Sequence, residues 1–494
     1  MTRRGAGAGA LAAVLGAATT LSFAPFGWWW LQAITLGGLA LLWRTAGPRE
    51  CAMSGFFFGL GWFTTGISWV YVSMHVYGAM PGPVAALATL LFAAYLALFP
   101  ALAGYAQARL RVSGLAQSVF VLPACWCLCE WLRGWLFTGF PWLAAGYAHT
   151  DGVLSGIGPI AGVHALNFVA AQAGALLAEV AVMRATPHAV ALGLLIAASF
   201  GTRGIEWTER TGEPTTIALI QGNISQDMKF EEGRFAATLA VYQGLVEAHP
   251  ATLTVLPETA LPRMWQAIPA VFLDRIADSA RARRGDVIVG VPFAESRERY
   301  FNSAVSLGTS PSQRYDKAHL VPFGEFIPFG FRWFVDWMRI PLGDFTSGTS
   351  APAPLRLGNE SVAINICYED LFGEEIIRQL PQATVLVNIS NIAWFGDSLA
   401  PHQHLQISRM RALESGRPML RATNTGFTAV IEANGRVVDR LPLFTEGALR
   451  ASVQGRAGST PFARTGNWPI VSLSACVLAV ALLRRRVRSV RAPA

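Results

Sequence analysis

The stretch Ser361-Val-Ala-Ile-Asn-Ile-Cys367-Tyr-Glu-Asp370 is an apolar, β-branched run that ends in a thiol and two carboxylates. Such a run predicts a buried strand that stops at Cys367. The other five cysteines lie in long hydrophobic runs: Cys51, Cys125, Cys127, Cys129 and Cys476. Cys367 therefore has no disulfide partner in the polar part of the chain. A lone cysteine in this position is a candidate nucleophile, with inert packing as the alternative.

Similar short runs surround this one between residues 211 and 459. The predicted strands are 216–221, 253–257, 286–292, 303–307, 361–367, 384–388, 419–423 and 428–432. Helices are predicted at 234–248 and 271–283, and Ala433-Asn-Gly-Arg436 predicts a hairpin turn. Strands that alternate with helices, with some antiparallel pairing, predict an α/β sandwich.

The rest of the chain has the composition of a membrane protein. Of 494 residues, 52% are hydrophobic and 14% are charged, against about 25% charged in an ordinary domain. Crossing a bilayer takes about 20 apolar residues. Apolar runs near that length cover 6–24, 28–43, 53–73, 82–105, 116–138, 158–182, 187–201 and 467–483. We therefore predict seven transmembrane helices at 1–204, a polar catalytic domain at 211–459, an eighth transmembrane helix at 467–483 and a basic tail at 484–494.

The first apolar run has an alternative interpretation as a cleaved signal peptide, because basic residues precede an Ala-rich stretch. Apolar character resumes at once through Trp28 and continues to Trp43, so we favour a hairpin of two membrane helices.

Basic residues are concentrated in alternate loops of this arrangement. One set holds Arg3, Arg4, Arg44, Arg49, Arg109, Arg111, Arg184 and the Arg-rich tail; in the other set Arg133 is the main exception. The positive-inside rule places the first set in the cytoplasm, which puts both termini inside and the polar domain in the periplasm. The net charge of +8 thus reflects membrane-flanking clusters and not a nucleic-acid surface.

Two further apolar runs end in residues that complement Cys367. Glu258 follows Leu253-Thr-Val-Leu-Pro and is a candidate general base, with a surface turn carboxylate as the alternative. Lys317 closes a strand and is a candidate oxyanion partner, with a solvated lysine as the alternative. Acyl transfer needs a nucleophile, a base and a cation of these types. We also expect Lys317 to lower the pKa of the Cys367 thiol.

The order Glu258, Lys317, Cys367 resembles the nitrilase superfamily of carbon–nitrogen hydrolases. A closer resemblance, over nearly the whole chain, is to the apolipoprotein N-acyltransferase family of the bacterial inner membrane. Its motifs are Lys317-Ala-His-Leu-Val-Pro-Phe-Gly-Glu325, Cys367-Tyr-Glu369 and residues 221–229, 257–259, 388–397 and 409–414. The resemblance implies an αββα sandwich, a triad of Glu258, Lys317 and Cys367, and supporting roles for Glu325, Tyr368 and Glu369.

The resemblance also implies the reaction. Cys367 would take a fatty acyl chain from a membrane phospholipid as a thioester and pass it to the N-terminal α-amine of a diacylglyceryl-cysteine apolipoprotein. This is the last step of bacterial lipoprotein maturation. We expect a monomer in the inner membrane, with no cofactor. No metal is expected either: the cysteines at 125, 127 and 129 are interpreted as packing, and His402 and His404 as structural.

Several aromatic residues are candidates for lipid contact. The stretch 329–341 and the segment 261–271 would form surfaces at the bilayer interface, with an ordinary buried helix as the alternative for the first. The candidates are Phe230, Met264, Trp265, Trp333, Trp337 and Trp394. Phe230 replaces a Trp that is common in the family, and Ile392 replaces a common Asp; neither belongs to the triad.

Two other functions fit parts of the pattern. A membrane-tethered amidase would use the same triad on a small amide, but it would gain nothing from the aromatic surfaces. A catalytically inactive scaffold would have no need for an intact triad.

Overall fold

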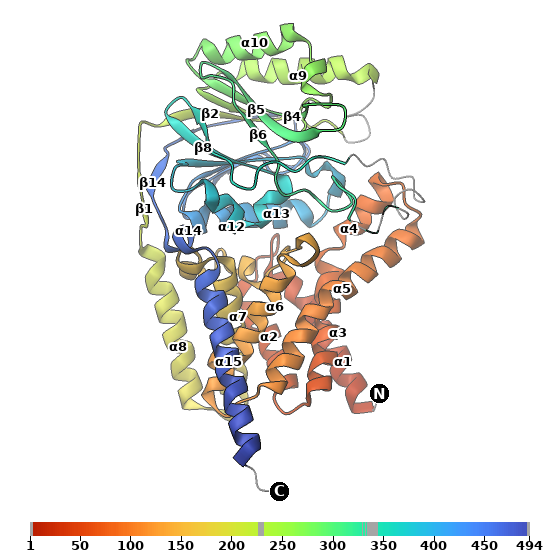
Figure 1. The fold of residues 1–494 in the computed structure, drawn as a ribbon, viewed down its shortest axis with the longest axis vertical. Helices are drawn as coiled ribbons and strands as arrows, with labels where there is room; N and C mark the ends of the chain where they lie inside the picture. The colour runs from red at the N-terminus through yellow and green to blue at the C-terminus, as the bar shows by residue number, and fades with distance from the viewer. Residues whose placement is uncertain (1–2, 226–231, 329, 331, 333–343, 492–494) are drawn as a thin grey trace. The chain divides into compact units, whose positions relative to one another are not determined.

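The computed structural model describes residues 3–225, 232–328, 330, 332 and 344–491 (Figure 1). It divides into two compact units. The first comprises Met1–Tyr71, Pro81–Ile205 and Arg464–Ala494, and the second comprises Val72–Met80 and Glu206–Ala463. The lipid-contact candidates Phe230, Trp333 and Trp337 lie outside the described residues.

The first unit is helical, and a helix occupies each predicted apolar run. The long helices are α1 (Arg3–Thr19), α2 (Trp29–Trp43), α3 (Pro48–Gly66), α5 (Gly82–Arg109), α6 (Leu122–Arg133), α7 (Gly158–Met183), α8 (Thr186–Gly201) and α15 (Trp468–Arg491). Among the described residues, Gly82–Arg109 and Ser155–Met183 are long and apolar enough to cross a membrane, whereas Gly7–Ser22 and Trp29–Trp43 are apolar but shorter. The count of eight membrane helices therefore stays a prediction.

Glycines let three of these helices approach closely. A side chain at Gly16 of α1 would clash with the backbone of Phe58 in α3, and one at Gly55 of α3 would clash with that of Pro100 in α5. Small residues at such crossings let the helix backbones make dispersion contacts. In a lipid bilayer the hydrophobic effect does not drive helices together, so contacts of this kind drive their association.

Arg133, the exception to the loop-charge pattern, is fully buried in this unit. Its guanidinium lies 2.8 Å from the Glu130 carboxylate and donates to the carbonyl oxygens of Phe140 and Trp142. A buried charge must be paired in this way. Arg133 is therefore an internal structural residue and does not count as a charge flanking the helices.

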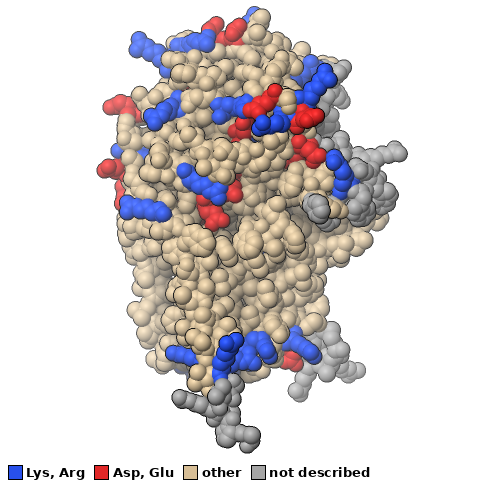
Figure 2. Space-filling view, viewed as in Figure 1, with Lys and Arg blue, Asp and Glu red and all other residues tan. Residues whose placement is uncertain are grey.

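Arginines of the predicted cytoplasmic loops meet at one end of the same unit. Arg111 donates to the carbonyl oxygens of Trp43 and Ala46 at 2.7 and 2.8 Å, and Arg485 donates to that of Arg109 at 2.7 Å. Figure 2 shows blue side chains gathered at this end of the helices, while the visible face along the helices carries no charge.

The second unit contains two six-stranded sheets. One runs in the order β13 (Gly447–Val453), β2 (Thr215–Gln221), β3 (Leu253–Val255), β4 (Asp286–Ala294), β5 (Tyr300–Gly308), β6 (Arg314–Asp316). The other runs β12 (Val437–Arg440), β11 (Ala429–Ile431), β10 (Met419–Thr423), β9 (Val385–Ser390), β8 (Glu360–Ile366), β7 (Leu355–Leu357). Strands β2 to β4 and β8 to β10 are parallel, and the outer strands are antiparallel.

Helices cover the outer face of each sheet (Figure 1). The first sheet carries α9 (Phe235–Ala248) and α10 (Ala270–Arg281), and the second carries α12 (Gly373–Ile376) and α13 (Ala400–Ser415). Shorter elements complete the chain: α4 (Trp69–Val72), α14 (Pro461–Thr465), and the two-stranded ribbon of β1 (Thr208–Arg210) and β14 (Arg456–Gly458).

Alternating side chains of the strands build three apolar layers. In β2, Ile217 and Leu219 face the cluster between the sheets, and Ala218 and Ile220 face the cluster under α9 and α10. Both faces of such strands are buried, so they appear in sequence as continuous apolar runs. The predicted αββα sandwich is thereby confirmed for this unit.

Gly290 in β4 provides a test of how this sheet supports Glu258. A side chain there would clash with the carbonyl oxygen of Pro257 and displace the Glu258 backbone. We predict that Gly290→Ala lowers the free energy of unfolding by about 1–3 kcal/mol, the usual cost of overpacking. Gly244 of α9 has open space around it, so Gly244→Ala should be stabilising by about 0.5–1 kcal/mol. The thermal unfolding midpoints of both variants test this prediction. A Gly290→Ala protein that is as stable as the wild type would contradict it.

Candidate functional site

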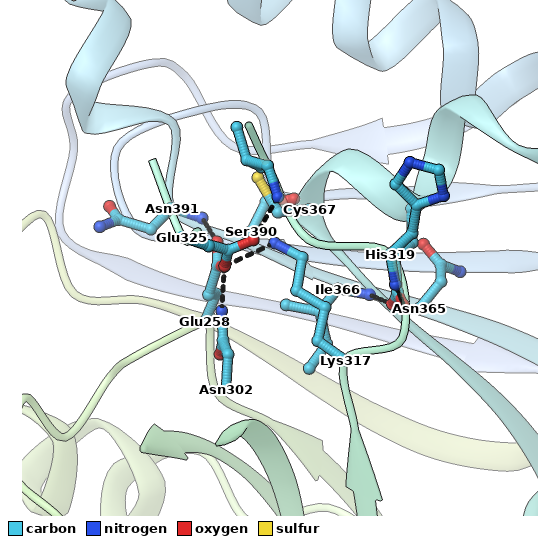
Figure 3. A network of polar contacts seen from close by, with 12 residues as sticks. Glu258, Asn302, Lys317, His319, Glu325, Asn365, Ile366, Cys367, Ser390 and Asn391 are labelled. Atoms are coloured by element: carbon cyan, nitrogen blue, oxygen red, sulfur yellow. Dashed lines mark hydrogen bonds and ion pairs between the residues drawn. The ribbon is translucent and has the colours of Figure 1, made fainter. Parts of the chain in front are cut away.

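Three strand ends bring the predicted triad together in the second unit. Glu258 follows β3, Lys317 follows β6 directly, and Cys367 follows β8 directly, so the two sheets both contribute. Figure 3 shows the side chains of these residues and of Glu325 converging on one point. Glu258, Lys317 and Glu325 are buried, and Cys367 is partly exposed.

Cys367 occupies a strained turn. Its φ of +54° lies in the left-handed region, which is uncommon for residues other than glycine. The turn opens the short helix Cys367–Leu371. A nucleophile on a sharp turn between a strand and a helix projects its side chain out of the sheet, where a substrate can reach it.

Glu258 is held by two donors and one cation. Its Oε1 accepts a hydrogen bond from the Asn302 side chain at 2.8 Å and lies 3.5 Å from the Lys317 ammonium. Its Oε2 accepts a hydrogen bond from the backbone amide of Asn391 at 2.7 Å. This carboxylate is therefore oriented before any substrate arrives.

Lys317 lies between two carboxylates. Its Nζ contacts Glu325 Oε1 at 2.8 Å, and the same oxygen accepts a hydrogen bond from Asn302 at 2.8 Å. One amide group of Asn302 thus fixes Glu258 and Glu325 together on either side of the ammonium. The supporting role predicted for Glu325 agrees with this position.

The electrostatics keep the resting thiol protonated and the lysine charged. Burial raises the pKa of the Cys367 thiol, the carboxylate of Glu258 raises it further, and the ammonium of Lys317 offsets only part of this. The expectation that Lys317 lowers the thiol pKa is correct for the contribution of Lys317 itself, but burial and Glu258 outweigh it, so the net pKa is raised. Burial alone would lower the pKa of Lys317, but Glu325 and Glu258 outweigh it and raise that pKa well above its usual range.

Glu369 joins the loops that carry the lysine and the cysteine. Its Oε1 accepts hydrogen bonds from the backbone amides of Ala318 and His319 at 2.7 and 3.1 Å. Its Oε2 accepts hydrogen bonds from the Tyr315 hydroxyl and the Ile366 amide at 2.8 and 2.7 Å. Burial raises the pKa of Glu369 to about 7.

Tyr368 is buried beside the aromatic rings of His319 and Phe372. The ring of His319 stacks on Phe372 with centroids 3.6 Å apart and hydrogen-bonds Glu375 at 3.1 Å. Tyr368 and Glu369 thus directly follow the nucleophile and are buried, and their supporting roles stay a prediction.

Two of the described lipid-contact candidates lie on the surface of this unit. Met264 is 37% exposed and Trp394 is 39% exposed. Trp394 packs edge-on against Tyr77, with ring centroids 6.3 Å apart. Trp265 differs, because its side chain packs against the apolar cluster under α9 and α10. Ile392, the departure from the family pattern, is buried and packs beneath Gly426.

The remaining candidates have structural positions. Cys125, Cys127 and Cys129 are buried in α6, and His402 packs edge-on against Phe427. Among the described residues no group of three His, Cys, Asp or Glu side chains is arranged to hold a metal ion.

Sequence reasoning missed several residues that shape the site. Asn302 is a buried amide within the apolar strand β5, and Asn391 follows β9. His404 is buried beside the carbonyl of Cys367, and Arg421 is buried against His404. A polar side chain inside an apolar run is the signal that marks Asn302 and Arg421, because such a group needs a buried partner.

Comparison with known proteins gives the family. A model of the apolipoprotein N-acyltransferase N-terminal domain matches residues 15–176, and a carbon–nitrogen hydrolase model matches residues 216–462. Proteins named apolipoprotein N-acyltransferase are similar over nearly full length. The one from Ralstonia nicotianae is 51% identical, covering 96% of this chain and 93% of its own. The one from Nitrosomonas europaea is 46% identical, covering 94% and 95%. The one from Methylococcus capsulatus is 43% identical, covering 94% of each.

Three observations indicate the same family: the names of these relatives, the two domain matches, and the converging Glu, Lys and Cys side chains. The chain therefore belongs to the apolipoprotein N-acyltransferase family of acyltransferase enzymes, with a nitrilase-type fold in its second unit.

Proposed function

We propose that this enzyme moves a fatty acyl chain from a membrane phospholipid to the N-terminal α-amine of a diacylglyceryl-cysteine apolipoprotein. The observation that carries the proposal is the Lys317 ammonium held between Glu258 and Glu325 beside a partly exposed Cys367. The relatives' names supply the acceptor class. Cys367, Glu258 and Lys317 are the proposed catalytic residues.

In the first half-reaction Glu258 takes the proton of the Cys367 thiol as the sulfur attacks the ester carbonyl of the phospholipid. The raised pKa of the thiol makes this base necessary, because little thiolate exists at neutral pH without it. The C–S bond forms, the ester C–O bond breaks, and Glu258 returns the proton to the departing lysophospholipid oxygen. A thioester on Cys367 remains.

In the second half-reaction the free α-amine of the acceptor attacks the thioester carbonyl. The C–N bond forms, the C–S bond breaks, and the proton lost by the amine passes through Glu258 to the Cys367 sulfur. In both steps the carbonyl oxygen gains negative charge. Lys317 stabilises that charge from a buried position, an effect of about 3–4 kcal/mol per donor in acyl-transfer enzymes.

The membrane arrangement is part of the proposal. Residues 1–204 would hold seven membrane helices and 467–483 the eighth, with the catalytic domain at 211–459 in the periplasm and the tail at 484–494 in the cytoplasm. The arginines gathered at one end of the helical unit support this orientation. The enzyme would act as a monomer in the inner membrane. Met264 and Trp394, with Phe230, Trp265, Trp333 and Trp337, are the proposed lipid contacts.

We predict that Cys367→Ala abolishes the covalent acyl group. Purified wild-type protein incubated with phospholipid carrying a radiolabelled acyl chain should retain hydroxylamine-sensitive label, and Cys367→Ala should retain none. Cys476→Ala is the matched control, since Cys476 is exposed on α15, and it should label as the wild type does. Label that persists in Cys367→Ala would sink the assignment. A membrane-tethered amidase would release ammonia from small amides and leave the phospholipid intact.

We predict that Glu258→Gln reduces the rate of thioester formation at least a hundredfold at pH 7, because the thiol loses its base. The residual rate should rise about tenfold per pH unit above neutral, since the thiol pKa is raised and thiolate then forms only by direct ionisation. Rates of acyl labelling from pH 6 to 9 provide the measurement. A variant that acylates at the wild-type rate, or whose rate falls with pH, contradicts the role of Glu258.

We predict that Lys317→Met prevents acylation and also lowers the free energy of unfolding by about 3–5 kcal/mol, because buried carboxylates lose their cation. Adding Glu325→Gln should restore part of the stability but none of the activity. Unfolding midpoints and acyl labelling of the single and double variants separate the two effects. Recovery of activity in the double variant would show that Lys317 has no role in the chemistry.

We predict that a cysteine at Asn434, on the exposed β11–β12 hairpin, reacts with a membrane-impermeant maleimide in intact spheroplasts. Both engineered cysteines are introduced into a Cys367→Ala, Cys476→Ala protein. A cysteine at the exposed Arg49 should react only after the membrane is permeabilised. The reverse pattern would place the catalytic domain in the cytoplasm.

A further inference from the structure

A buried polar network lies directly behind the nucleophile. His404 on α13, Arg421 on β10, and Asp370 three residues after Cys367 are all almost fully buried. Arg421 Nη1 lies 3.2 Å from Asp370 Oδ2, which balances its charge. The same nitrogen donates to Asn388 Oδ1 at 2.7 Å. The proposed reaction does not use these groups.

The hydrogen bonds of the network fix the state of the His404 ring. Arg421 Nη2 lies 2.9 Å from His404 Nδ1, and a guanidinium can only donate, so Nδ1 is the acceptor. The ring proton therefore sits on Nε2. Burial and the charge of Arg421 lower the pKa of His404 well below its usual range, which keeps the ring neutral.

His404 Nε2 then donates to the carbonyl oxygen of Cys367 at 3.2 Å. The side chain of Asn388 reaches the same oxygen at 3.4 Å. The positive charge of Arg421 polarises the ring, and hydrogen bonds in such a chain strengthen one another in a low-dielectric interior. Two buried donors thus hold the carbonyl of the residue whose φ of +54° is strained.

This anchor orients the whole peptide between Cys367 and Tyr368. The peptide is planar, so a carbonyl held toward His404 turns the amide N–H of Tyr368 in the opposite direction. In α/β-hydrolases the N–H of the residue after the nucleophile is one of the donors that stabilise the tetrahedral oxyanion, and the Tyr368 N–H has the same place in sequence after Cys367. A carbonyl that swung free would relax the strained turn and misdirect this N–H.

We propose that His404 is a positioning residue of the acyl-transfer site, which holds the Cys367–Tyr368 peptide in its reactive orientation by donating to the Cys367 carbonyl. The inference rests on the proposed acyl transfer at Cys367. By this inference His404, which Arg421 contacts from behind, affects the rate of turnover although it does not touch the substrate.

The test compares four variants of the full-length protein in detergent. His404→Leu removes the hydrogen bond, and His404→Asn keeps a polar group that is too short to reach the Cys367 carbonyl. His404→Gln retains a donor of the right length. His402→Leu is the matched control, because His402 lies on the same helix, is partly buried and packs edge-on against the ring of Phe427. Three readouts are taken for each: the rate of acyl-enzyme formation from phospholipid, the rate of Cys367 alkylation by iodoacetamide, and the melting temperature.

We expect His404→Leu and His404→Asn to slow acyl-enzyme formation about a hundredfold, the effect of losing one oxyanion donor, through kcat and not KM. Alkylation needs no oxyanion donor and should stay within about threefold of the wild type. The rate of acyl-enzyme formation in His404→Gln should lie within about tenfold of the wild-type rate, and that in His402→Leu should equal it. If His404→Leu does not fold, the Asn and Gln pair decides.

Two results would overturn the inference. One is acylation within about threefold of the wild type in His404→Asn. The other is an equal loss of acylation and alkylation with a lowered melting temperature that Gln does not repair, which would mean that His404 only packs. A wild-type enzyme that never forms an acyl group on Cys367 would instead refute the proposed function, and the inference with it.

Discussion

The ion group of Lys317 with Glu258 and Glu325 is the constraint on which the second unit depends. Two carboxylates and one ammonium share a buried site, so the group carries one excess negative charge. The two carboxylates keep the lysine cationic, and burial, with a further contribution from Glu258, keeps the thiol neutral until a substrate carbonyl arrives. Charge then develops on the carbonyl oxygen, where the ammonium can meet it. The desolvation cost of such a group is high, and the surrounding amides of Asn302 and Asn391 offset part of it.

Three separate strand ends must meet for this group to form, and the sandwich provides the meeting point. Glu258 and Lys317 come from one sheet and Cys367 comes from the other. The apolar layer between the sheets sets their separation. Glu369 then ties the Lys317 loop to the Cys367 turn through four hydrogen bonds. The site is thus rigid because it is built on regular structure and not on free loops.

The strand pattern and the triad were predictable from sequence because both are local signals. Apolar runs mark β2, β8 and β10 within a residue or so, and the runs at β3 and β8 lead into Glu258 and Cys367. Asn302 was not assigned and His404 was assigned only a structural role, since the roles of both depend on partners far away in sequence. The net rise of the thiol pKa was not predicted, for the same reason. The sequence shows Lys317, which lowers the thiol pKa. It does not show the burial of the thiol or the proximity of Glu258, and these two effects together outweigh that of Lys317.

The short segment Val72–Met80 has a practical consequence. It belongs to the compact catalytic unit, although the chain on both sides of it belongs to the helical unit. Its Tyr77 covers Trp394, and the same segment lies against Gly396. A fragment cut at 206 and 463 for expression in water would therefore leave an aromatic side chain uncovered, and such patches promote aggregation. A workable excised domain would need a substitute for this segment, supplied as a linked peptide or as a polar replacement of Trp394.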